Sequence, residues 1–126
     1  MKFVAVYALM ALTFFSNGAS ASMMNCPHVI YVSVSAATVS VNSEVVAIAD
    51  IKERLQSLKQ SAKYIFYYRE NAQSEPTDEE WQRSKQILDA MMSLRLPISL
   101  SSKPDFSDSI DGQGNSQPRT ACPDEA

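Results

Sequence analysis

Hydrophobic and polar residues alternate over two short stretches of the chain. Within residues 29–35 the side chains form two sets on opposite faces, an apolar set of Ile30, Val32 and Val34 and a second set of Tyr31, Ser33 and Ser35. The alternation resumes at 39–42, and a period of two residues is typical of half-buried strands. Asn42 and Ser43 are a turn signal, because asparagine tolerates left-handed backbone. The pattern predicts a hairpin, with residues 45–46 either extending its second strand or leading into a helix.

Two later stretches have helical spacing. Between residues 50 and 61, Ile51, Leu55 and Leu58 recur at steps of four and three, and Asp50 is a candidate N-cap. Thr77 with Glu80 predicts a capping box for a second helix, which is expected to end near residue 94 because Pro97 disfavours helix before it. The face of this helix that is expected to be buried comprises Trp81, Ile87, Leu88, Met91, Met92 and Leu94.

Two short runs complete the predicted sheet. The aromatic run 64–68 predicts a third strand, with Ile65 and Tyr67 on one face and Tyr64, Phe66 and Tyr68 on the other. Residues 98–100 predict a fourth. The order β-β-α-β-α-β predicts a small α+β domain of two layers, in which both helices pack on one face of a four-stranded sheet.

The first 21 residues resemble a secretory signal peptide. Lys2 precedes an apolar run at 3–15 that is too short to span a bilayer, and small residues follow at 19–21. Cleavage is expected after Ala21, with an uncleaved anchor as the alternative. The mature protein is therefore expected to be exported to the periplasm, or alternatively to the medium.

Export changes the interpretation of the two cysteines. Cys26 and Cys122 lie at opposite ends of the mature chain, and in an oxidising compartment an even number of cysteines favours a disulfide. The alternative is two free thiols in loose ends. Residues 22–104 are expected to form the folded domain and 105–126 a polar acidic tail, which such a disulfide would tie down.

Composition excludes several classes of function. The chain of 126 residues has 11 basic and 14 acidic residues, a net charge of −3, which argues against nucleic acid as a partner. No glycine lies between residues 19 and 111, which excludes glycine-rich phosphate loops and the nucleophile elbow there. His28 is the one histidine, and Asp78, Glu79 and Glu80 suit a helix start. We expect no enzyme activity, cofactor or metal site.

The expected site is a binding surface. Tyr67, Tyr68 and Arg69 end the aromatic strand, and Tyr31 on the first strand is expected to join them in an exposed patch, since tyrosine and arginine are enriched at binding hot spots. The alternative is that the tail or a second subunit covers these rings. Ile98 and Leu100 on the fourth strand offer a sheet edge to which an extended peptide or a second copy would add.

Residues 29–101 resemble the periplasmic domain of the ExbD/TolR family, accessory subunits of proton-driven motors in Gram-negative envelopes. The matching stretches are Val32–Ser35 and Val39–Asn42 for the paired strands, Ile51–Leu58 for the first helix, Tyr64–Tyr67 for the third strand, Trp81–Leu94 for the second helix and Ile98–Ser101 for the last strand.

The resemblance implies a protein-interaction domain that binds an envelope protein, the cell wall or itself as a homodimer. Transport members of the family carry an aspartate in an N-terminal transmembrane helix, whereas residues 3–15 here contain no acidic residue. A motor role is therefore not expected. The alternative functions are a small secreted inhibitor of a wall-degrading enzyme, using the loop at 70–76, and a small exported enzyme.

Overall fold

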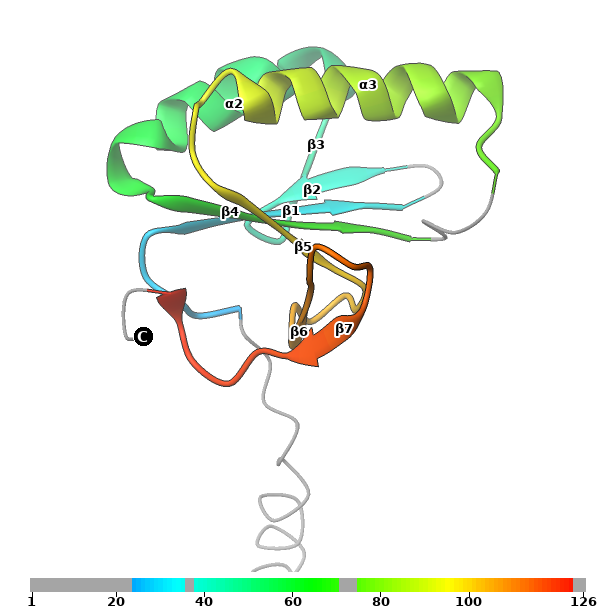
Figure 1. The fold of residues 1–126 in the computed structure, drawn as a ribbon. Helices are drawn as coiled ribbons and strands as arrows, with labels where there is room; N and C mark the ends of the chain where they lie inside the picture. The colour runs from blue at the N-terminus through cyan, green and yellow to red at the C-terminus, as the bar shows by residue number, and fades with distance from the viewer. Residues whose placement is uncertain (1–23, 36–37, 71–74, 124–126) are drawn as a thin grey trace, which may run out of the picture.

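The computed structural model of the chain describes residues 24–35, 38–70 and 75–123. The expected signal peptide, the hairpin connection at 36–37 and most of the loop at 70–76 lie outside the described residues. Helices α2 (Ile51–Leu58) and α3 (Asp78–Met92) lie side by side over one face of the main sheet (Figure 1). The α+β class is confirmed.

The main sheet has five strands rather than the four expected. Its spatial order is β3-β2-β1-β4-β5, and the strands are β1 (Val29–Val34), β2 (Val39–Val41), β3 (Glu44–Val46), β4 (Tyr64–Arg69) and β5 (Ile98–Ser101). β1, β4 and β5 are parallel, whereas β2 and β3 are antiparallel to their neighbours. The additional strand exists because Asn42 and Ser43 adopt φ values of 51° and 68°, so a two-residue turn reverses the chain at this point.

The helix starts differ in how they are capped. Thr77 and Glu80 form the predicted capping box, because Thr77 Oγ1 accepts from the Glu80 N–H at 3.2 Å and Glu80 Oε1 accepts from the Thr77 N–H at 2.9 Å. Asp50 stands at the N-cap of α2, but its side chain makes no capping hydrogen bond. A 3₁₀ turn, η1 (Ile48–Asp50), runs directly into α2, so Asp50 has helical rather than extended backbone.

The core between sheet and helices is aliphatic. Its buried members include Ile30, Val32, Val41, Leu55, Ile65, Ile87, Met91 and Leu94. The prediction that Trp81 and Met92 are buried is wrong, since their exposed fractions are 54% and 64%. Both lie on the flank of α3, about 120–140° around the helix axis from the centre of its buried face, where the sheet no longer covers the helix.

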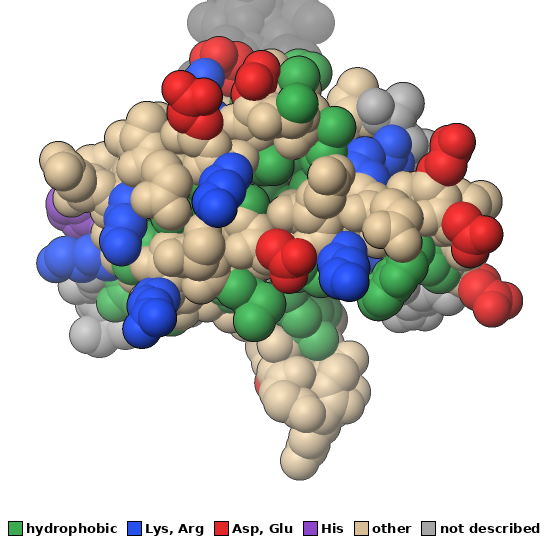
Figure 2. Space-filling view, turned by 90° about the horizontal axis from the view of Figure 1, so that it is seen from above, with side chains coloured by type: hydrophobic (Ala, Val, Ile, Leu, Met, Phe, Trp, Pro, Cys, Tyr) green, Lys and Arg blue, Asp and Glu red, His purple; other side chains and the backbone are tan. Residues whose placement is uncertain are grey.

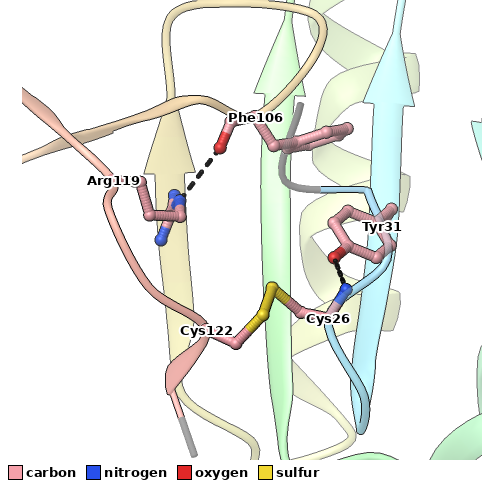
Figure 3. Close-up of a disulfide and its surroundings, with 5 residues drawn as sticks. All are labelled: Cys26, Tyr31, Phe106, Arg119 and Cys122. Carbon is pink, nitrogen blue, oxygen red and sulfur yellow. Dashed lines mark hydrogen bonds between the residues drawn. A yellow bond between two sulfur atoms is a disulfide. The ribbon is translucent and has the colours of Figure 1, made fainter. Parts of the chain in front are cut away.

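The opposite face of the sheet is covered by the C-terminal part of the chain. After β5 the chain forms a small hairpin of β6 (Asp108–Ile110) and β7 (Ser116–Pro118), and Phe106 packs with Tyr31 and Phe66 in a second buried cluster. The predicted disulfide between Cys26 and Cys122 is present, with a Cα–Cα distance of 5.4 Å (Figure 3). The described part of the expected tail is therefore folded.

Buried polar contacts hold this C-terminal segment. Asp108 accepts hydrogen bonds from the Ser102 N–H at 2.9 Å, from the Ser102 hydroxyl and from the Ser116 hydroxyl at 2.6 Å. The Arg119 guanidinium donates to the Phe106 and Asp108 carbonyls at 3.0 and 2.9 Å and to two serine hydroxyls of β5. These bonds satisfy the charged groups that the segment buries.

Candidate functional site: the outer edge of β5 and the flank of α3

The structure does not bring the predicted aromatic residues together. Tyr31 is buried beneath the C-terminal segment, where its hydroxyl oxygen accepts from the Cys26 N–H at 2.9 Å and its ring meets Phe66 and Phe106 edge-on (Figure 3). Burial raises the pKa of the Tyr31 phenol. The alternative that the tail covers these rings is therefore the arrangement observed.

The three residues that end β4 also diverge. Tyr67 is buried on the helix-covered face, and this burial raises the pKa of its phenol. Tyr68 points to the opposite face, with its ring 6.5 Å from that of Phe106, and Arg69 is half-buried at the strand end. Of the predicted binding residues, Tyr67, Arg69, Ile98 and Leu100 lie on the helix-covered face, whereas Tyr31 and Tyr68 lie on the opposite face.

β5 is an edge strand, and no described strand pairs with its outer side. The Pro97 carbonyl accepts from the Ile65 N–H at 2.9 Å, which shows that Pro97 bonds inward to β4. Because alternate residues of a parallel strand bond to the same neighbour, Ser99 and Ser101 also face β4. Ile98 and Leu100 therefore direct their backbone N–H and C=O groups outward.

An apolar stripe of α3 runs above this edge. Trp81, Leu88 and Met92 recur at steps of seven and four residues and share one flank of the helix. The other flank, with Asp89 and Ser93, lines a hollow that it shares with residues of η1 and α2.

α2 lies on the β3 side of the sheet, where Arg54 pairs with Glu44 at 2.9 Å. The apolar stripe of α3 therefore faces away from α2, toward the β5 edge. Figure 2, seen from above the helices, shows hydrophobic side chains gathered along a margin of the helical layer.

We call this feature the β5–α3 surface and define it by Trp81, Leu88, Met92, Ile98 and Leu100. Leu100 has an exposed fraction of 46%, and Leu88 and Ile98 are half-buried against the core. An unpaired strand edge beside exposed tryptophan, methionine and leucine is a combination that folded proteins use for binding. The backbone groups can pair with a partner strand, and the apolar side chains leave water when the partner covers them. Periodicity had placed Trp81 and Met92 on the buried face; their position outside the border of that face is the signal for this role.

The described residues offer little else of chemical note. No group of three or more histidine, cysteine or carboxylate side chains among them is arranged to hold a metal ion. His28 lies exposed, with Nδ1 3.2 Å from the Ser61 carbonyl oxygen. None of the helices in this described part has the length and apolar character needed to cross a membrane.

Comparison with known proteins adds no relative. No family model matches the chain, and no curated protein matches it. The function is therefore argued from the β5–α3 surface.

Proposed function

We propose that this protein is an exported, non-catalytic interaction module that binds an extended segment of an envelope protein along the outer edge of β5. The observation that carries the proposal is the coincidence of outward backbone groups at Ile98 and Leu100 with the exposed apolar stripe of α3. Strand addition combines these two features, because the backbone supplies hydrogen bonds and alternate side chains enter the neighbouring apolar surface.

Three further observations support the compartment and the class. The signal-like residues 1–21 and the Cys26–Cys122 disulfide fit an oxidising compartment, for which we propose the periplasm. The resemblance of residues 29–101 to the ExbD/TolR periplasmic domain suits an interaction module of the cell envelope. The absence of an acidic residue from 3–15 argues against a role in proton transfer.

The proposal is tested by amide exchange with a neutral peptide in which valine and threonine alternate. Binding by strand addition should protect the amides of Ile98 and Leu100 from hydrogen exchange, whereas a peptide N-methylated at alternate residues should not protect them. Leu100→Pro removes one outward N–H and should abolish binding, while Leu100→Ala keeps it and should weaken binding only partly. Binding that leaves both amides unprotected would exclude this edge.

A second candidate is a secreted inhibitor of a wall-degrading enzyme, favoured by the projecting β6–β7 hairpin. The residues of its tip are exposed, and the Asp111 carboxylate fixes them by accepting from the Gln113 and Asn115 N–H groups at 2.9 Å each. A rigid polar tip of this kind suits insertion into a cleft. Slower hydrolysis of purified cell wall by a lytic enzyme, abolished when residues 112–114 are replaced, would support this function instead.

A further inference from the structure

Basic side chains frame the β5–α3 surface. Lys85 lies within the apolar stripe of α3, Arg95 precedes β5 by three residues, and Lys103 follows it by two; all three are exposed. The ion pair between Arg54 and Glu44 lies at the β3 edge of the sheet and involves none of these three cations. The surface is locally positive on a chain whose net charge is −3.

The carboxylates nearest to this surface make other contacts. Asp89 lines the hollow on the α2 side of α3, Asp105 Oδ1 accepts from the Ser107 N–H at 3.0 Å, and Asp108 is buried. Asp78 lies one turn before Trp81, at the helix start, where the positive end of the helix stabilises it. Both ends of the β5 edge therefore carry a basic side chain, although Asp105 partly balances Lys103 and Asp89 follows Lys85 by one helical turn.

The backbone at this edge offers few hydrogen bonds. Pro97 faces β4, and the Ser102 N–H is already bonded to Asp108 Oδ1 at 2.9 Å. An added strand can therefore pair only with the outward groups of Ile98 and Leu100. Because so few backbone hydrogen bonds form, most of the selectivity comes from the side chains of the added segment. These side chains point alternately toward and away from the α3 stripe.

A second copy of the chain does not suit this edge. Antiparallel pairing that uses all four outward groups places Ile98 opposite Leu100 of the second copy, and it brings the strand end that carries Arg95 toward the end that carries Lys103 in the second copy. Like charges brought close together in this way are destabilising. The charges that repel a second copy attract a carboxylate-bearing segment instead.

We propose that the β5–α3 surface selects an extended protein segment with apolar residues at alternate positions and carboxylates on both flanks. The inference rests on the proposed function and adds the chemistry of the partner to it. The alternate apolar side chains contact Trp81, Leu88 and Met92, and the flanking carboxylates lie beside Arg95 and Lys103. Attraction of this kind increases the rate of association and sets specificity.

The test uses three peptides that share one alternating valine–threonine core and differ in their flanks, which are glutamate, glutamine or lysine. The chain contains one tryptophan, Trp81, which lies within the surface, so its emission should shift to shorter wavelength on binding. In about 0.05 M salt, the glutamate-flanked peptide should bind about tenfold more tightly than the glutamine-flanked one, and the lysine-flanked peptide most weakly. In about 1 M salt the three affinities should converge, because screening is then nearly complete.

Matched variants separate this inference from the proposed function. Arg95→Gln with Lys103→Gln should remove most of the advantage of the glutamate flanks, whereas Lys59→Gln, on the turn after α2, should leave it unchanged. Equal affinity for all three peptides, with Ile98 and Leu100 amides protected, would overturn the charge preference and leave strand addition intact. Absence of protection with every peptide would overturn both, and self-association that blocks the peptides would identify a second copy as the occupant.

Discussion

At the scale of single residues, Arg119 holds the C-terminal segment to the main sheet. Its guanidinium donates to two backbone carbonyls of the segment and to the hydroxyls of Ser99 and Ser101 on β5, and it lies 3.8 Å from the centre of the Phe66 ring. Burial lowers the pKa of Arg119, but an arginine side chain stays protonated in proteins. One planar cation therefore joins β5, β6 and the aromatic cluster.

Arg119→Lys should lower the free energy of unfolding by about 2–4 kcal/mol, although it conserves charge. An ammonium group cannot reach all of these acceptors, and buried groups left without partners are costly. Urea unfolding followed by circular dichroism measures the change, with Lys52→Arg on the exposed side of α2 as the control. A loss below about 0.5 kcal/mol, the scatter of ordinary surface changes, would contradict the role given to the guanidinium.

Asp108 should make stability depend on pH. Burial by itself would raise the pKa of this carboxyl, but the hydrogen bonds from Ser102 and Ser116 outweigh it and lower the pKa below the ordinary value. An aspartate has a pKa of about 3.9 in an unfolded chain. The stabilisation is therefore complete well above that pH and is lost as the pH falls through the lower, folded-state value.

Comparison of Asp108→Asn with the wild type isolates this contribution. The variant should be less stable by about 1–3 kcal/mol at neutral pH, and the difference should shrink as the pH is lowered below about 3.9, the pKa of an aspartate in an unfolded chain. Urea unfolding across the acid range measures both, and Asp89→Asn on α3 controls for the change in net charge. A difference that stays constant with pH would show that the carboxylate of Asp108 is not the group responsible.

At the scale of elements, the sequence was informative wherever a local pattern determines the structure. β1 follows from alternation, β4 from its aromatic run, and the start of α3 from the capping box of Thr77, because these signals lie within a few neighbouring residues. β6 and β7 consist of polar residues with one isoleucine and one proline and have no such pattern. They are held by Arg119, Asp108 and the disulfide, which are contacts between distant parts of the chain.

The candidate site was predictable only in part, for the same reason. Ile98 and Leu100 were expected at an exposed edge, and the structure places them there. Trp81 and Met92 were assigned to the core, because helical spacing shows which residues are apolar but not how far a neighbouring sheet reaches around the helix. Tyr31 was expected to be exposed, since nothing local predicts that Phe106 returns to cover it.

The disulfide should contribute more to stability than the burial of its two side chains does. It closes a loop with a sequence separation of 96 residues, and restricting an unfolded chain over that length stabilises the folded state by about 4–5 kcal/mol at most. Replacing both cysteines with alanine should therefore lower the free energy of unfolding by about 2–5 kcal/mol, measured in urea.

The same variant should open the C-terminal segment first, because Cys122 fixes its end to the chain before β1. Trypsin cleavage after Arg119 should then become faster than cleavage after Lys52 and Lys59 in α2 and its following turn, as followed by mass spectrometry. Equal acceleration at all three sites would indicate global unfolding instead.

At the scale of the whole molecule, two features have opposite effects on self-association. An exposed strand edge beside an apolar stripe promotes self-association, which many proteins prevent with charges at the edge. Here Arg95 and Lys103 flank β5 at its two ends and are exposed. The wild-type chain should therefore stay monomeric in low salt, although its edge is chemically able to pair.

Reversing one of these charges should convert repulsion into attraction. In the antiparallel register that uses the outward groups of Ile98 and Leu100, Lys103→Glu brings a carboxylate toward the strand end that carries Arg95 in a second copy, twice per dimer because the pairing is two-fold symmetric. Sedimentation in about 0.05 M salt should then detect a dimer that dissociates in about 1 M salt. Lys59→Glu changes the net charge equally but lies far from the edge in the sequence, so it should remain monomeric. If both variants behave alike, total charge rather than the β5 edge governs association, and the two-fold register assigned to this strand is wrong.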